Sequence, residues 1–427
     1  MRSALANENS RSVRGWTFAF LAFVGMGTAA QAALVGLDTA KNYNIFVTDS
    51  ARRSSTSVAG RIATGGDLDL RSVGVGSAIS SGLNLEVGGR FMTDGGSVKG
   101  DIIVAGNADV KNPTFQGKLD VRGNVDHSSG GSFSGQVTTG GYFTSASNTT
   151  FSGPVRIGSY LDVSGNITAN SGVDVKGFFR SGTPSISGGL RVNSNVTFAS
   201  SGGSVSGGLT YGGTYSGPSY ITRSQQSETA VVPASANIGL DFANLSSQLQ
   251  VDSLEISDLT ANGIVQRSGN TLTLSGSESD INVFSISATD LNGLSNFIIS
   301  APSGSAVIVN ISGGSVTFGN HGYAFNGGSL AANASNLLFN AFEATSVVHS
   351  SLGGTLLAPN ATVDFNSGTF TGTLIANRLN DGGGSFAYAA AFSGDIGGAP
   401  STAFVPEPAT LGPTILAGAL CLRRNRS

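Results

Sequence analysis

A short motif recurs about every eighteen residues along the first half of the chain and constrains the fold more than any other feature. The motif is a β-forming residue, a polar residue and a glycine, followed by another strand-like run, as in Phe133-Ser134-Gly135. Successive glycines are 17, 18, 18, 35 and 19 residues apart, and 35 is two periods; they are Gly100, Gly117, Gly135, Gly153, Gly188 and Gly207. A fixed period of this length predicts stacked, structurally equivalent units.

Within one period the residues alternate as they do in half-buried strands. Leu119, Val121 and Val125 are separated by polar neighbours, which places the apolar set on one face. About three short strands fit into eighteen residues, divided by Gly or Asn, which accept the positive φ of sharp corners. We therefore predict an all-β parallel β-solenoid, with about nine coils between residues 58 and 215. A β-sandwich is the alternative, but its turns would not hold one register for so long.

The composition fits this fold and excludes several others. Gly makes up 62 of 427 residues, about twice the usual share, whereas charged residues are only 11%. The chain lacks the heptads of a coiled coil, the Gly-X-Y period of collagen and the cysteines of a disulfide scaffold. A net charge of −3 argues against a nucleic-acid partner.

The register fails after Tyr215, and residues 216–260 are predicted to hold a connection and one helix. Leucines and Phe242 recur at mixed spacings, which favours a short amphipathic helix over residues 240–250 that covers a flank or end of the solenoid. Strand patterns resume at residues 271–274, 281–286, 297–299 and 306–311. Gly354 and Gly372 are again 18 residues apart, so both halves are expected to share one core. Residues 385–404, rich in Ala and Gly, suggest a stalk.

The N-terminal residues 1–32 have the pattern of a secretory signal peptide. Basic residues precede an apolar run over residues 16–26, and the segment ends in Ala30-Gln31-Ala32, which predicts cleavage before Ala33. An apolar run of this length is too short to span a bilayer as a helix. The mature chain is therefore expected to be secreted.

The C-terminal residues 405–427 combine three ordered features. Pro406, Glu407 and Pro408 precede an apolar stretch at residues 411–422, and Arg423 and Arg424 follow it. This order resembles the PEP-CTERM sorting signal of Gram-negative bacteria. The resemblance implies transient membrane insertion, an exosortase-type processing enzyme as a partner, and a destination at the outer surface or extracellular matrix. The only cysteine, Cys421, lies in this tail.

Several blocks of the chain resemble the choice-of-anchor A family. They are residues 43–47 (YNIFV), 57–67 (SVAGRIATGGD), 281–284 (INVF), 301–310 (APSGSAVIVN) and 357–361 (LAPNA). The resemblance implies an extracellular adhesin domain of β-helical character over residues 33–384, with no established catalytic residues. The coil-rich residues 97–215 are then an expansion within that domain.

No constellation in the sequence points clearly to chemistry. His127, His321 and His349 are too far apart for a local metal pair, so we expect no metal or other cofactor. Carboxylate pairs such as Asp67 with Asp69, Asp101 with Asp109, or Glu278 with Asp280 could serve a glycosidase, or bind Ca²⁺ if carbonyl groups joined them. No cluster of three acids with flanking basic residues accompanies them.

We therefore predict a non-enzymatic adhesive protein that contacts exopolysaccharide or envelope matrix. Outward polar residues are the candidate contacts, namely Thr138, Thr139, Thr144, Ser145 and Thr150. Two alternatives remain open: a carbohydrate-active β-helix enzyme, and an ice-binding solenoid, against which stands that regular Thr-x-Thr ladders do not recur from coil to coil.

Overall fold

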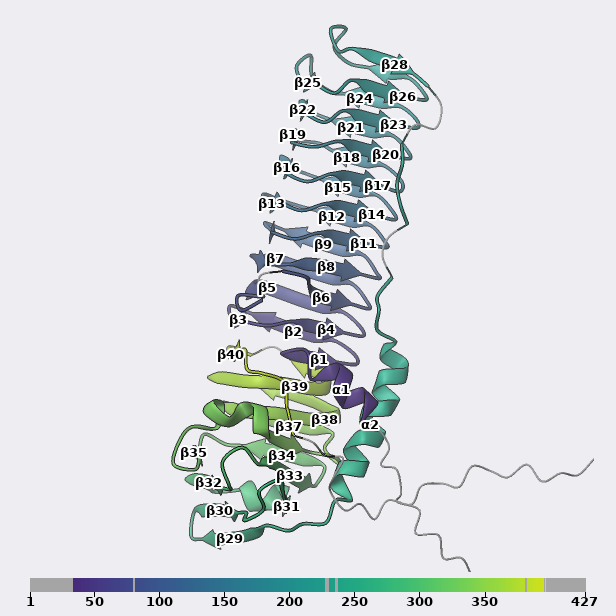
Figure 1. The fold of residues 1–427 in the computed structure, drawn as a ribbon. Helices are drawn as coiled ribbons and strands as arrows, with labels where there is room; N and C mark the ends of the chain where they lie inside the picture. The colour runs from purple at the N-terminus through teal and green to yellow at the C-terminus, as the bar shows by residue number, and fades with distance from the viewer. Residues whose placement is uncertain are drawn as a thin grey trace, which may run out of the picture. The chain divides into compact units, whose positions relative to one another are not determined.

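Short strands stacked in parallel form a three-sided solenoid (Figure 1), as the eighteen-residue period predicts. The computed structural model describes residues 34–79, 81–226, 230–234, 237–380, 382–394 and 396. The predicted signal peptide with its Ala30, Ala32 and Ala33, and the predicted sorting signal at residues 405–427, lie outside these residues.

Three strips of parallel strands make the three sides, which we call the helix face, the charged face and the hydroxyl face. The helix face comprises β31 (Ile281–Ser287), β33 (Ala306–Ser312), β36 (Leu337–Asn340), β1 (Ile45–Val47), β4 (Ile62–Thr64), β6 (Leu83–Val87), β8 (Asp101–Val104), β11 (Leu119–Val121), β14 (Val137–Thr139), β17 (Val155–Ile157), β20 (Val173–Val175), β23 (Leu190–Val192), β26 (Leu209–Tyr211) and β28 (Arg223–Gln225).

The charged face comprises β34 (Ser315–Phe318), β37 (Ser346–His349), β2 (Ala51–Ser54), the first part of β5 (Leu68–Val75) and of β7 (Phe91–Val98), β9 (Ala108–Lys111), β12 (Val125–His127), β15 (Phe143–Ser145), β18 (Leu161–Val163), β21 (Phe179–Ser181), β24 (Val196–Phe198) and β27 (Tyr215–Ser216). The hydroxyl face comprises β40 (Ser385–Ala387), β3 (Ser57–Val58), the ends of β5 and β7, β10 (Thr114–Phe115), β13 (Ser132–Phe133), β16 (Thr149–Phe151), β19 (Ile167–Ala169), β22 (Pro184–Ile186) and β25 (Ser204–Val205).

The remaining elements belong to the second half of the chain. Two long strands bend round the coil and contribute to more than one face: β38 (Leu352–Phe365) and β39 (Thr369–Asn380). A separate sheet contains β29 (Ile264–Ser268), β30 (Thr271–Ser275), β32 (Asn296–Ser300) and β35 (Gly322–Phe325). The helices are α1 (Val35–Ala40), α2 (Phe242–Ser257) and the 3₁₀ turns η1 (Ala288–Leu291) and η2 (Leu330–Asn336).

The first strand of the solenoid lies in the middle of the stack rather than at an end. β1 pairs in parallel with β4 on one side and with β39, more than 300 residues later, on the other. From β1 the coils proceed to β28, and the chain then returns along the helix face and through α2 to the opposite end, where β29 begins the second half (Figure 1). Both halves therefore share one core, as predicted.

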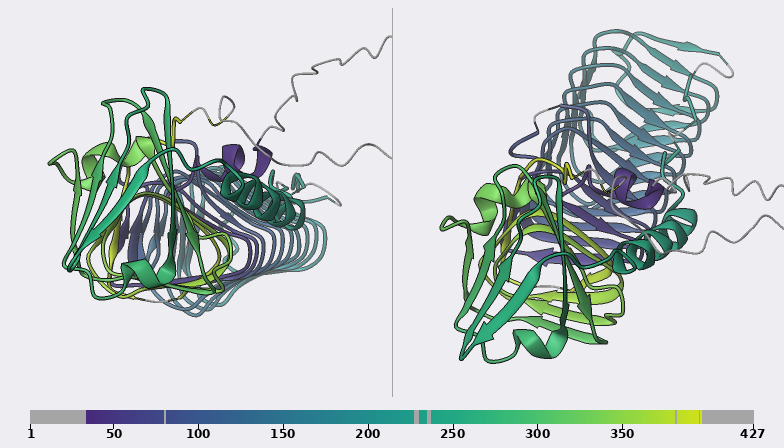
Figure 2. Two further views of the ribbon diagram at one scale, coloured as in Figure 1. Left: turned by 90° about the horizontal axis from the view of Figure 1, so that it is seen from below. Right: turned by 60° about the horizontal axis from the view of Figure 1, so that its bottom comes forward.

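Helix α2 lies along the outside of the helix face, as the end-on view of Figure 2 shows, and it covers an apolar stripe there. Each coil under the helices contributes one outward apolar side chain, and these are Val283, Ile308, Leu338, Leu357, Ile375, Phe46 and Ala63. Leu245, Leu249 and Ile256 of α2 pack against them. In the next coil, the position in register with Ala63 is occupied by Glu86. The apolar stripe therefore ends close to where the covering helices end.

The helix is longer than the predicted range of residues 240–250. It begins after Asp241, whose side chain accepts a hydrogen bond from Asn244 N at 3.1 Å, as N-cap residues do. Its buried side continues through Asp252 and Ser253 to Ile256. Those two polar residues interrupt the apolar periodicity, which made the second half of the helix hard to recognise from the sequence.

The corner glycines are explained by close packing more often than by positive φ. Of the six repeat glycines only Gly100 has a left-handed φ, of 75°. At Gly135 a Cβ would lie 2.2 Å from the carbonyl oxygen of Gly117 in the preceding coil. The corners stack backbone on backbone and leave no room for a side chain. Our expectation of positive φ at these corners was therefore wrong for most of them.

The expected stalk at residues 385–404 is also corrected over its first part. Ser385–Ala387 forms β40, which pairs with both β39 and β3, and Phe392 and Ile396 are buried against the helix face. The folded region therefore extends at least to residue 396. Small residues in this segment allow close packing at the junction of the two halves. The same composition is typical of flexible linkers, and for that reason the sequence predicted a stalk.

Candidate functional site

The hydroxyl face carries a regular row of outward Ser and Thr side chains. The row holds one residue per coil over six successive coils, paired in register: Thr114, Ser132, Thr150, Thr168, Ser185 and Ser204. Thr150, Thr168, Ser185 and Ser204 are exposed, and the other two are half-buried. The sequence alternation causes this orientation, because the following residue of each coil, such as Phe115 or Phe133, points inward and is buried.

A second polar row runs parallel to the first. Its members are all exposed, and they are Gln116, Ser134, Ser152, Asn170, Ser187 and Ser206. The parallel backbone ladder continues through them, since Ser134 N donates to Phe115 O and Ser152 N to Phe133 O, both at 2.8 Å. Coils in such a ladder are about 4.8 Å apart, and alternate residues of a strand about 6.6 Å. The two rows thus form an uncharged lattice of hydroxyl and amide groups.

The predicted contact residues are distributed over different surroundings. Thr150 lies in the exposed hydroxyl row, whereas Thr138 and Thr139 are 2% and 0% exposed. Thr144 is half-buried on the charged face and donates to Asp126 Oδ1 at 2.6 Å, and Ser145 is buried beside His127. Thr150 is therefore the only one of the five predicted contact residues that lies exposed in the hydroxyl row.

Thr138 is buried although it occupies an outward position of the helix face, along which the chain returns. It lies in register between Asp120 and Arg156. Arg156 Nη1 donates to Val231 O at 3.2 Å, and Arg122 hydrogen-bonds to Asn237, so the returning segment is held on the coils beside it. Alternation distinguishes the two sides of a strand, but it does not reveal whether another segment covers the outer side.

The charged face holds its ionic side chains in pairs between neighbouring coils. Lys111 pairs with Asp94 at 2.8 Å and Arg180 with Asp162 at 2.7 Å. These residues line the solvent side of the sheet, where each pair contributes up to about 1 kcal/mol.

Four of the six carboxylates considered for catalysis have structural partners, and among the described residues Glu278 and Asp280 accept only from the hydroxyls of Ser277 and Ser279. Asp69 pairs with Arg52 and Arg71, and Asp109 pairs with Arg90. Asp67 and Asp101 accept backbone N–H groups of the next coil, from Arg90 at 2.8 Å and Lys118 at 2.9 Å. These bonds hold adjacent coils in register.

Two of the three histidines are part of the core. His127 is 2% exposed and contacts the hydroxyls of Ser145 and Thr149, and burial lowers its pKa. His349 stacks on Phe365 at 4.3 Å between ring centroids, and burial lowers its pKa to about 3, so it is neutral at physiological pH. In the part of the chain that the structure describes, no three His, Cys, Asp or Glu side chains are grouped so that they could hold a metal ion.

A four-residue pattern in the sequence could have revealed the hydroxyl face. Each corner glycine is preceded by a hydroxyl residue, an inward apolar residue and a second polar residue, as in Thr150-Phe151-Ser152-Gly153. The last three positions defined the repeat, but the first was not included in the motif. A motif that began one residue earlier would have included the Ser or Thr position of each of these coils.

Among the described helices, none combines the length and apolar character needed to cross a bilayer.

Comparison with known proteins gives one family and several solved structures. A search of curated proteins found no match. The chain is similar in structure to the C-terminal domain of a tapirin from Caldicellulosiruptor kristjanssonii, at 11% identity over 82% of this chain and 93% of that chain, with a TM-score of 0.21. It is also similar to a possible adhesin C-terminal domain from Caldicellulosiruptor kronotskyensis (11% identity, 81% and 92% covered, TM-score 0.26). A third is an ice binding protein from an Antarctic Flavobacteriaceae bacterium (12% identity, 82% and 97% covered, TM-score 0.23).

The family model matches both halves of the chain. It is described as "Putative Ice-binding-like adhesive domain" and matches residues 36–161 and 121–388. The two matches overlap within the stacked coils, where one coil repeats the pattern of the next. Because the matched residues cover most of the chain, the protein belongs to this family of ice-binding-like adhesive domains.

Proposed function

We propose that the protein is a non-enzymatic extracellular adhesin whose hydroxyl face contacts neutral polysaccharide. The observation that carries the proposal is the uncharged double row, repeated in register over six coils. Each Ser and Thr hydroxyl can both donate and accept a hydrogen bond, which matches the hydroxyls of a sugar chain.

The energetics favour a long ligand over a short one. A single hydrogen bond contributes only about 0.5–1.5 kcal/mol net, because both partners leave water. Linked contacts along several coils add avidity, since each later contact is made within one complex. An uncharged surface also avoids the cost of burying an unpaired charge beneath the ligand.

Polysaccharide pull-down with the purified protein tests the proposal. A double variant, Thr150→Lys with Thr168→Lys, places two like charges in adjacent positions of the hydroxyl row. We expect it to lose most binding to neutral polysaccharide while keeping its far-UV circular dichroism. Thr197→Lys, at a half-buried position on the charged face, is the matched control and should bind as the wild type does.

Measurement of newly formed reducing ends of the polysaccharide in the same experiment distinguishes a carbohydrate-active enzyme from an adhesin. Retention of polysaccharide with no release of ends supports an adhesin. Cleavage that continues in the double variant would contradict the proposed function.

Ice contact is a second candidate that the same lattice favours. A flat array of hydroxyls at fixed spacing could order water as well as sugar. Inhibition of ice recrystallisation by the wild type, lost in the same double variant, together with no binding in the pull-down, would select this candidate.

The predicted sorting also enters the proposal. We propose that residues 1–32 direct export and that residues 405–427 act as a PEP-CTERM signal of a choice-of-anchor A protein, processed by an exosortase-type enzyme. Mass spectrometry of the protein released by its host should then give a chain that begins at Ala33 and lacks Arg423 and Arg424.

A further inference from the structure

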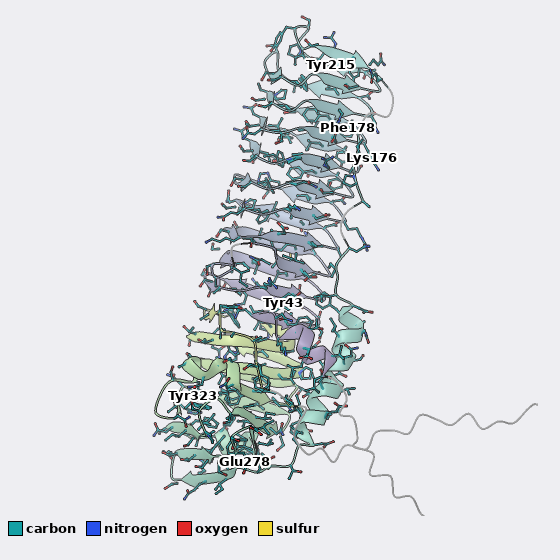
Figure 3. All side chains as sticks on the ribbon, in the orientation of Figure 1. Tyr43, Lys176, Phe178, Tyr215, Glu278 and Tyr323 are labelled. Carbon is teal, nitrogen blue, oxygen red and sulfur yellow. The ribbon has the colours of Figure 1, made fainter. Side chains whose placement is uncertain are left out.

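A small polar pocket lies where the two halves of the solenoid join, beside the first coil. Its volume is about 230 Å³, below the roughly 300–1,000 Å³ of pockets that hold drug-sized ligands, and it suits a group the size of one sugar unit. Its wall includes Lys41, Tyr43, Arg61, Thr373 and Tyr388. Figure 3 labels Tyr43, which lies close to the first coils at this junction.

Most polar groups of the pocket are already engaged within the fold. Lys41 Nζ donates to Asp38 Oδ1 at 2.6 Å, and Tyr43 Oη donates to Glu86 Oε1 at 2.5 Å. Thr373 Oγ1 donates to Lys41 O at 3.3 Å. These bonds fix the shape of the wall before any ligand arrives.

Arg61 differs from the other groups of the pocket wall. Its side chain is half-buried, and its Nε is buried without a hydrogen-bond partner among the described residues. By contrast, Arg90, Arg180 and Arg378 on the charged face each pair with an aspartate of a neighbouring coil. No ion pair between described residues involves Arg61. Arg61 is part of the pocket wall, and an arginine side chain carries up to five N–H donors in a fixed planar geometry.

The electrostatic surroundings limit the charge of the occupant. Glu86 is 4% exposed, and the positive charge of Arg61 acts on both Glu86 and Tyr43. Glu86 is not part of the pocket wall, but its carboxylate is near enough to Arg61 to disfavour a dianion such as phosphate more than a single carboxylate. A single carboxylate matches the planar fork of one arginine and carries only one charge.

The exposed aromatic ring at the pocket mouth adds a second element of recognition. Tyr388 is 50% exposed although its neighbour Phe386 is buried in the core. Its ring offers an apolar side and a hydroxyl to a ligand that has both C–H and O–H groups. A sugar carries both, whereas a simple carboxylate does not.

We propose that this pocket binds the carboxylate of an acidic sugar unit, with Arg61 as the carboxylate-binding residue and Tyr388 beside the ring. The site is distinct from the hydroxyl face, and its inference does not depend on the contact with neutral polysaccharide. Where both hold, the protein can bind two chemically different glycans at once.

Titration of the purified protein with galacturonate and glucuronate, followed by NMR, tests the proposal. Galactose and acetate serve as probes that lack the carboxylate or the sugar. We expect at least one uronate to bind at least tenfold more tightly than either probe. Arg61→Gln should weaken that binding at least tenfold, and Tyr388→Ala should weaken it less. Arg180→Gln, which removes an arginine of the charged face, is the control and should bind as the wild type does.

Three results would overturn the inference. They are absence of binding by both uronates, equal binding of acetate and uronate, and unchanged affinity in Arg61→Gln. If Arg61→Gln fails to fold, two other measurements test the site: the uronate affinity of Tyr388→Ala, and the rise in the urea midpoint of the wild type when uronate is added. An unchanged midpoint would contradict the site. Neutral-polysaccharide pull-down with Arg61→Gln separates the two proposals, since it should be unaffected.

Discussion

Replacing Gly135 by alanine tests the close stacking of the solenoid corners. The new Cβ would lie 2.2 Å from Gly117 O, whereas ordinary contacts begin near 3.4 Å, so the two corners must separate by about 1.2 Å. The adjacent bonds from Ser134 N to Phe115 O and from Leu119 N to Gln136 O are both 2.8 Å. The same displacement would lengthen each to about 4.0 Å, which is no longer a hydrogen bond.

The expected loss of stability follows from these contacts. Two broken backbone bonds cost about 1 kcal/mol each, and overpacking adds about 1–3 kcal/mol, so we expect Gly135→Ala to lose about 3–5 kcal/mol. Gly314→Ala is the matched control, because no atom lies within 4 Å of its Cβ position. That variant should change stability by less than about 1 kcal/mol.

Urea unfolding followed by circular dichroism measures both variants. Stacked coils can unfold in parts, so hydrogen exchange of the amides around residue 135 should accompany the midpoints. If Gly135→Ala and Gly314→Ala unfold at the same urea concentration, close stacking is not the reason for the repeated glycines.

Three further predictions concern the core and the helix. Phe133→Ala should cost about 3–5 kcal/mol in urea unfolding, because this side chain is 1% exposed and packs against the rings of the neighbouring coils; a loss below about 1 kcal/mol would contradict this. Asn340→Ala should cost about 1–3 kcal/mol, because Asn340 exchanges hydrogen bonds of 2.6 and 2.8 Å with Ser253 of α2; the control Ser257→Ala removes a hydroxyl that bonds only within its own helix, to Leu254 O, and should cost less than about 1 kcal/mol. Burial raises the pKa of Asp252 to about 6, so its contribution to stability is fully present below about pH 4 and is lost as the pH rises through 6. Urea midpoints of Asp252→Asn should lack this part of the pH dependence, and an unchanged profile would refute the assignment.

The sequence alone was sufficient for the coil architecture. Alternation at Leu119, Val121 and Val125 reports which side chains point inward, because successive residues of a strand face opposite sides. The eighteen-residue spacing of glycines reports the length of one coil. Both signals are local or strictly periodic, so they do not depend on knowledge of distant contacts.

The tertiary structure decided which strand lies beside which. β1 pairs with β39 as well as with β4. The sequence of β1 does not predict its pairing with β39, because parallel pairing uses backbone groups that every residue possesses. The same register places Thr150 between Ser132 and Thr168 and so creates the hydroxyl row.

The same distinction between sequence and tertiary structure applies to the candidate sites. The sequence contains every hydroxyl of the lattice, but only the fold shows that Thr138 is covered and Thr150 is open. It also contains Arg61, Thr373 and Tyr388, which line one pocket although Arg61 lies more than 300 residues before the other two along the chain. Local pattern therefore determined the coil and the direction of its side chains, whereas long-range stacking determined which of them meet and which remain exposed.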